Sequence, residues 1–101
     1  GNVVVVYMRI VLTSKGSSVG SVSLTGLPFT SQNTSDLFPT HYLYTEGMAA
    51  GTLGPGFGII LNNSTSYILQ HYNIATGANS SYVNTEVNNT SAFICSGTYY
   101  I

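Results

Sequence analysis

The chain opens with an almost continuous apolar run, VVVVYMRIVL at positions 3–12. Successive side chains of a strand point to opposite faces, so this run is apolar on both of its faces. One face carries Val4, Val6, Met8, Ile10 and Leu12, and the other carries Val3, Val5, Tyr7, Arg9 and Val11. A strand with one face in water alternates cleanly between apolar and polar residues. We therefore predict a central strand that is covered twice, by its own core and by a neighbouring subunit that contacts Val5, Tyr7, Arg9 and Val11.

Most of the remaining chain alternates β-branched or aromatic residues with hydroxyl residues, and no window shows helical spacing. The pattern predicts a hairpin turn at 14–17 and a return strand at 19–27 that ends before Pro28. Further strands are predicted at 40–45, 59–61, 66–72, around 82–83 and at 91–101. A tight turn through Asn62 and Asn63 joins strands 59–61 and 66–72, because Asn tolerates the left-handed region.

Two segments are predicted to be loops. Residues 30–39 are polar and end in a proline, and the segment EGMAAGTLGPGFG at 46–58 contains five glycines, which indicates a long, mobile connection. About seven or eight short strands separated by Gly and Asn turns predict an all-β, antiparallel β-sandwich of jelly-roll type. With 101 residues, positions 1–101 are predicted to form a single domain.

Composition narrows the functional classes. The chain has two Lys or Arg residues, three Asp or Glu residues and a formal net charge of −1. It cannot neutralise a row of phosphates, so we expect no nucleic-acid partner and no anionic membrane surface. The longest apolar run is about half the length of a spanning helix, which predicts no membrane insertion. The single cysteine, Cys95, excludes an internal disulfide.

Candidate catalytic motifs lack the context that their chemistry requires. Residues 16–20 match G-x-S-x-G around Ser18, but a nucleophile elbow needs a following helix, and here a hairpin turn is expected. The glycine-rich segment likewise has no helix start or lysine to hold a phosphate. Asp36, Glu46 and Glu86 lie in separate loop-like segments and are read as solvated charges rather than an acid–base pair, although one of them could pair with Arg9.

The two histidines and the cysteine are read in the same way. His41 and His71 lack a second ligand at suitable spacing, although a three-fold axis could gather three copies of one histidine. Cys95 alternates with Phe93 and Tyr99 and is predicted to be a small buried hydrophobe. We therefore predict no metal, no cofactor and no enzymatic activity.

Tyrosine is abundant, with eight copies in the chain. The rings either fill the core and a subunit interface or form a contact surface for glycan or protein. For a receptor-binding surface, the sequence favours His41, Tyr42 and Tyr44 together with the loop from Asn33 to Asp36, because loops on a rigid scaffold often carry recognition.

Three segments carry a resemblance to a known family: YMRIVLTSKGSSVGSVSLTGLPFTS, NNSTSYILQ and NNTSAFICSGTYYI. They resemble a C-terminal β-sandwich module found on tail fibres, tailspikes and capsid fibres of tailed bacteriophages. The shared features are the hydrophobic spacing, Gly-Leu-Pro-Phe and the terminal Ser-Gly-x-Tyr. The family commonly has an aromatic residue at the position of Cys95, and its pattern begins before Gly1.

The resemblance implies a homotrimer on the surface of a virion. The implied homotrimer would contact other virion proteins and would act at the tip of a fibre or spike in attachment to a host glycan or protein. Two alternatives remain open: a capsid decoration or trimerising cap without a receptor, and part of a polysaccharide-processing tailspike. Six overlapping N-x-S/T sequons would instead suit a glycosylated secreted protein, and in a phage protein they would be unmodified.

Overall fold

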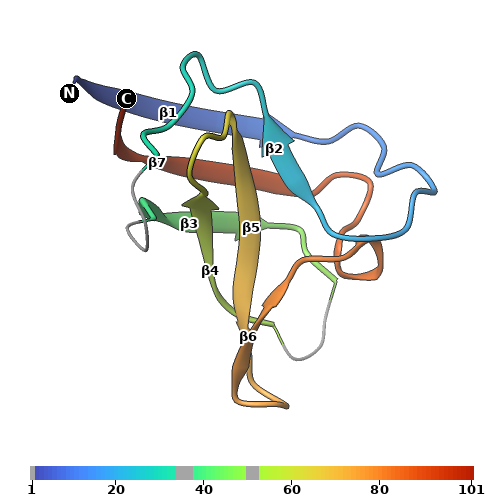
Figure 1. The fold of residues 1–101 in the computed structure, drawn as a ribbon. Helices are drawn as coiled ribbons and strands as arrows, with labels where there is room; N and C mark the ends of the chain where they lie inside the picture. Colours follow the sequence, from blue (N-terminus) through green and yellow to red (C-terminus); the bar gives the residue numbers. More distant parts are fainter. Residues whose placement is uncertain (1, 34–37, 50–52) are drawn as a thin grey trace.

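The computed structural model describes residues 2–33, 38–49 and 53–101, and it is an all-β structure (Figure 1). Its strands are β1 (Val3–Val11), β2 (Ser23–Thr25), β3 (Thr40–Glu46), β4 (Leu53–Ile60), β5 (Ser66–Asn73), β6 (Ala78–Ser81) and β7 (Ala92–Tyr100), with one 3₁₀ turn, η1 (Asn84–Glu86). Every strand pairing is antiparallel. The prediction of an all-β, antiparallel fold is confirmed.

The seven strands form one hydrogen-bonded sheet in the order β1-β7-β3-β4-β5-β2, with β6 also paired to β5. This sheet curls into half a barrel, so that β1 and β7 run at a steep angle to β5 in Figure 1. The two ends of the chain lie side by side because Val3 of β1 pairs with Tyr100 of β7. The inner face of the curl holds the core.

The strand predicted at 3–12 is present as β1, and its even-numbered side chains pack against the core as expected. Its predicted central place in the sheet is wrong, because among the described strands β1 pairs with β7 alone and is an edge strand. The expected hairpin partner does not form. Of residues 19–27 only β2 is a strand, and it pairs with β5 at the other end of the sheet.

Hydrogen bonds to distant parts of the chain explain why the segment after β1 does not turn back. Leu12 N donates to Ser91 O at 2.9 Å, Lys15 Nζ donates to Asn84 O at 3.2 Å, and Val22 N donates to Tyr82 O at 2.8 Å. These contacts hold residues 12–22 against η1 and the start of β7, so the chain crosses the open side of the half-barrel before it reaches β2 (Figure 1).

The glycine-rich segment is the second correction, because much of the predicted mobile loop is strand β4. Gly54, Gly56 and Gly58 alternate along this strand and leave room for aromatic side chains. A Cβ atom on Gly56 would lie 2.7 Å from the Tyr82 hydroxyl, and one on Gly58 would lie 2.9 Å from Cδ1 of Tyr67. The glycines therefore have a packing role in a regular strand, with a register shift between Leu53 and Gly56.

The hairpin predicted through Asn62 and Asn63 is confirmed as the β4–β5 connection, where Asn63 has a φ of 52°. The strand predicted around 82–83 is displaced. Pairing with β5 occurs at β6, and Val83 forms only an isolated bridge to Ser21. The terminal strand is confirmed as β7.

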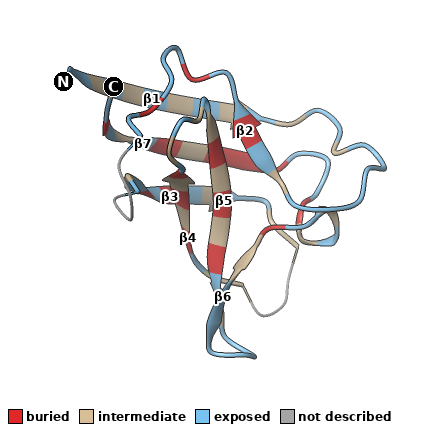
Figure 2. Cartoon of the chain, viewed as in Figure 1, coloured by how far each residue is buried: buried red, intermediate tan, exposed pale blue. Residues whose placement is uncertain are grey.

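The core lies between the inner face of the sheet and the loops that cross it (Figure 2). Its fully buried members include four aromatic or aliphatic residues of β5 and β7, namely Tyr67, Leu69, Phe93 and Tyr99. The Tyr99 hydroxyl donates to Phe29 O at 2.9 Å, which fixes the Gly-Leu-Pro-Phe segment over the end of β7.

Candidate functional site

The most distinctive surface of the domain is the outer face of its sheet. Its apolar and aromatic members come from β1, β7, β3, β4 and β5; they are Val3, Val5, Tyr7, Val11, Ile94, Tyr100, Tyr42, Tyr44, Phe57, Ile59, Ile68 and Tyr72. Residues that face one another across antiparallel strands lie on the same side of the sheet. The pairings Arg9–Ile94, Ile94–Tyr44 and Tyr42–Phe57 therefore join these side chains into one continuous surface.

Much of this outer face is accessible to solvent. Val5 is 79% exposed, Tyr7 is 67% exposed and Tyr42 is 70% exposed. Single exposed apolar side chains are ordinary, but contiguous apolar patches on one face mark sites of interaction. The four residues predicted to form a subunit interface, Val5, Tyr7, Arg9 and Val11, all belong to this face and are exposed in the single chain.

The backbone of β1 adds a second feature to the same place. Leu12 N donates to Ser91 O, and Ile101 N donates to Asn2 O at 3.0 Å, so even-numbered positions bond toward β7. Antiparallel pairing alternates, which leaves the N–H and C=O groups of the odd-numbered residues on the open edge. This edge is nine residues long, whereas β2 has three residues and β6 has four. Native proteins usually cover or interrupt an edge of this length.

Among the described residues, the charges on the outer face are Arg9 on β1 and Glu46 at the end of β3. The Tyr44 hydroxyl donates to Glu46 Oε1 at 2.9 Å. This hydrogen bond and the negative charge of the carboxylate raise the pKa of Tyr44, because both favour the neutral phenol. The tyrosine thus holds one of the described charges of this face in a defined position.

The structure divides the predicted receptor-binding residues. Tyr42 and Tyr44 lie on the outer face, and Asn33 is exposed in a loop that is tied to the end of β7 by a hydrogen bond from Gln32 N to Tyr100 O at 2.7 Å. Asp36 lies outside the described residues. The predicted receptor-binding residues are close to one another along the chain. Closeness in sequence does not determine on which side of a strand a side chain points.

His41 does not belong to this surface, which corrects its predicted role. It alternates with Tyr42 and faces the core, where it is 7% exposed. Its Nε2 lies 2.7 Å from Thr98 O and its Nδ1 lies 2.6 Å from the Tyr67 hydroxyl. A carbonyl oxygen only accepts, so Nε2 donates to Thr98 and Nδ1 accepts from Tyr67. The imidazole is a fully hydrogen-bonded core group.

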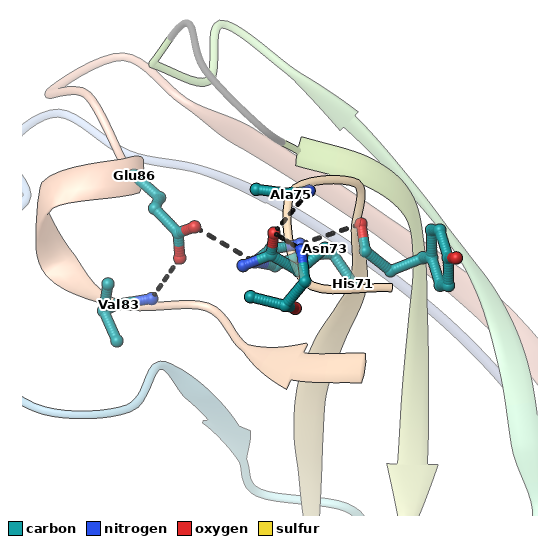
Figure 3. Close-up of polar contacts among 7 residues, drawn as sticks. His71, Asn73, Ala75, Val83 and Glu86 are labelled. Atoms are coloured by element: carbon teal, nitrogen blue, oxygen red, sulfur yellow. Dashed lines mark hydrogen bonds and ion pairs between the residues drawn. The ribbon is translucent and has the colours of Figure 1, made fainter. Parts of the chain in front are cut away.

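His71 is also a core residue, and its partner corrects the reading of Glu86 as a solvated charge. The imidazole is completely buried, and its Nε2 lies 3.0 Å from Glu86 Oε2 (Figure 3). The other oxygen of Glu86 accepts a hydrogen bond from Val83 N at 2.9 Å. The carboxylate therefore fastens η1 to β5. His71 and Glu86 are 15 positions apart in sequence, and no local sequence pattern indicates that they pair.

Other candidate chemistry does not converge on a site. Burial raises the pKa of the Cys95 thiol, which is consistent with its predicted place in the core. Ser18 is exposed in the loop between β1 and β2. Among residues 2–33, 38–49 and 53–101, no three His, Cys, Asp or Glu side chains are gathered as a metal site would require. Within the same ranges no helix has the length and apolar character needed to cross a membrane.

Sequence reasoning missed the contribution of β4 to the outer face. Phe57 and Ile59 extend the surface from Tyr42 toward β5. The sequence pattern predicts a loop at Phe57 and a short strand at Ile59, because glycines surround them. The alternation of Gly54, Gly56 and Gly58 with larger residues was the available signal, since a period of two is typical of a strand.

Comparison of the chain with protein-family models, with curated proteins and with solved structures finds no match. The candidate function therefore depends on the surface described above and on the resemblance of the sequence segments.

Proposed function

We propose that this domain is a non-enzymatic structural module of a tailed-bacteriophage virion, where it forms a homotrimer at the tip of a fibre or spike and contributes to attachment to the host surface. The observation that carries the proposal is the exposed outer face, which places Val5, Tyr7 and Val11 in solvent along an uncovered edge strand. In the proposed assembly, neighbouring subunits cover this face. The finer fold, a jelly-roll sandwich that is completed in a trimer, is part of the same proposal.

The energetics of the outer face favour assembly. Complete burial of a valine side chain contributes about 1.5–3 kcal/mol relative to its exposed state. Val3, Val5 and Val11 are each about half exposed or more, and exposed tyrosines border them. Association must offset roughly 4–15 kcal/mol of lost translational and rotational freedom. A face with this many apolar side chains in each copy supplies a contribution of that order.

Attachment would use the exposed tyrosines that subunit packing leaves accessible. Tyrosine presents an apolar ring for stacking on a sugar and a hydroxyl for hydrogen bonding, and it has few torsions to freeze. Tyr42 and Tyr44 alternate on β3 and both point outward. Three weak sites on one rigid trimer would combine into a stronger attachment through avidity.

The burial of His41 favours a second candidate function. Without its imidazole, the predicted receptor surface has fewer polar groups for sugar recognition, and the two tyrosines of β3 are its remaining members on the sheet. A surface of that kind suits packing against another virion protein as well as it suits sugar recognition. The domain would then be a capsid decoration or trimerising cap without a receptor.

Assembly is tested by sedimentation equilibrium of the wild-type domain and of two valine variants. Val5 and Val19 are both strongly exposed, but Val19 lies in the β1–β2 loop, away from the outer face. We expect a trimer for the wild type and for Val19→Glu, and a monomer for Val5→Glu. A wild-type domain that stays monomeric into the high micromolar range would refute the proposed assembly.

Attachment is tested on an array of bacterial surface polysaccharides and lipopolysaccharides. We expect Tyr42→Ala to lose binding while its trimer persists, and Tyr72→Ala to retain binding as a matched control on β5. Binding that survives Tyr42→Ala would refute the assignment of this tyrosine to the receptor surface. An array without any bound glycan would favour the decoration or cap function.

A further inference from the structure

The two charges on the outer face have opposite signs and are not paired with each other. Among the described parts of the chain, the one ion pair joins His71 and Glu86, so Arg9 has no carboxylate partner there. Glu46 receives one hydrogen bond, from the Tyr44 hydroxyl to Oε1. In this protein, which has only two Lys or Arg residues, an exposed arginine within an apolar surface requires a physical reason.

The register shows how the charges are placed. Arg9 pairs with Ile94, which pairs with Tyr44, so these three residues form one row across the sheet. Glu46 lies in the next row on the same face, opposite Ala92. Since neighbouring strands are about 4.8 Å apart and each residue advances about 3.4 Å, the two Cα atoms are separated by two strands and two residues, or roughly 12 Å.

We propose that Arg9 of one copy forms an ion pair with Glu46 of a neighbouring copy when their outer faces meet. The inference rests on the proposed self-association, and it identifies the contact that sets the relative orientation of the subunits. Covering the apolar face removes water from both charges, and a buried guanidinium or carboxylate without a partner is costly. Among the described residues, each outer face carries one charge of each sign, so a second copy supplies an oppositely charged partner for both.

The local structure prepares both groups for this contact. Glu46 is held by Tyr44, and its carboxylate can still accept the two parallel N–H groups of a guanidinium. Arg9 lies among Val5, Tyr7 and Val11, which would exclude water around the pair.

A second copy of the chain fits this face better than a highly charged partner. A polyanion would be attracted by Arg9 but repelled by the carboxylate of Glu46 on the same surface. A polycation would be attracted by Glu46 but repelled by Arg9. Like charges placed opposite each other across an interface cost several kcal/mol, so this pattern selects against both. A surface with one charge of each sign is complementary to a copy of itself.

The test uses two charge reversals and their mixture, measured by sedimentation with differently labelled chains. Arg9→Glu gives a face with two negative charges, and Glu46→Arg gives a face with two positive charges. Each variant alone should self-associate at least about tenfold more weakly than the wild type, because like charges then meet. An equimolar mixture should recover most of the association through mixed trimers, in which two of the three contacts join unlike charges. The double variant Arg9→Glu/Glu46→Arg should assemble as the wild type does.

The mixture separates a contact between copies from an effect inside one chain, since repulsion within each chain would persist after mixing. Singles that weaken without recovery in the mixture therefore overturn the inference. Singles that assemble normally overturn it and leave the proposed assembly intact, whereas a monomeric wild type overturns both. Circular dichroism checks the folding of each variant. If a reversal does not fold, Arg9→Gln and Glu46→Gln replace it in a double-mutant cycle, where additive effects would refute the pair.

Discussion

The packing of His41 over Gly97 gives a prediction whose magnitude can be worked from the structure. A Cβ atom on Gly97 would meet the imidazole of His41 at 2.5 Å from Nε2 and 2.6 Å from Cγ. These contacts are far inside van der Waals distance, so Gly97→Ala forces the ring to move by about 1 Å. That movement breaks the bonds that the two ring nitrogens make to Tyr67 and to Thr98 O at 2.6 and 2.7 Å.

The cost of Gly97→Ala has three parts. Overpacking a core contributes about 1–3 kcal/mol, and two lost hydrogen bonds contribute about 0.5–1.5 kcal/mol each. Replacing a glycine lowers the entropy of the unfolded chain, which offsets about 0.4–1 kcal/mol. We expect Gly97→Ala to lower the free energy of unfolding by about 1–5 kcal/mol.

A double-mutant cycle identifies the ring as the cause, because His41 supplies all three of the nearest atoms. In a His41→Ala background the added methyl group meets open space, so Gly97→Ala should then be nearly neutral. Urea unfolding followed by tyrosine fluorescence, at one fixed protein concentration, measures the four free energies. An equal cost in both backgrounds, or a single variant within about 0.5 kcal/mol of the wild type, would refute this account of the core.

Three further outcomes are expected from the interior of the half-barrel. Glu86→Gln should lower the free energy of unfolding by about 1–3 kcal/mol, because the buried Nε2 of His71 loses its charged partner. An unchanged urea midpoint would show that the pair with His71 contributes nothing. Cys95 should resist alkylation by iodoacetamide at pH 8 until the chain unfolds, since burial raises the pKa of its thiol; rapid labelling of native protein, seen by mass spectrometry, would contradict this. Burial also raises the pKa of the Tyr67 and Tyr82 hydroxyls. The ordinary pKa values are 9.0 for the Cys95 thiol and 10.0 for a tyrosine hydroxyl, so above these values the unfolded chain loses protons that the folded chain keeps. Stability should therefore be fully present below pH 9 and fall as the pH rises toward 11, and a flat thermal midpoint across that interval would be inconsistent with these buried groups.

The sequence by itself determined the fold class and the direction of side chains along the longer strands. Period-two alternation in β1, β3 and β7 is a local property of an extended backbone, so it could be read without knowledge of any partner strand. The β4–β5 turn was also local, because Asn63 accepts a positive φ. By the same reasoning, the inward direction of His41 was available from its alternation with Tyr42, although grouping by proximity along the chain obscured it.

Only the tertiary structure decided which strands became neighbours and which glycines were structural. Pairing between strands depends on contacts between residues far apart in the chain, such as Leu12 with Ser91, and these placed β1 at an edge and β2 beside β5. From the sequence, Gly56 and Gly58 indicate a flexible loop. In the structure they lie in a strand, where Tyr82 and Tyr67 occupy the space beside them. The pairing of His71 with Glu86 likewise exists only after β5 and η1 meet. Backbone preferences depend on neighbouring residues and can be predicted from the sequence. The space beside a glycine and the partner of a buried charge depend on distant segments, so they are determined only when these segments pack together.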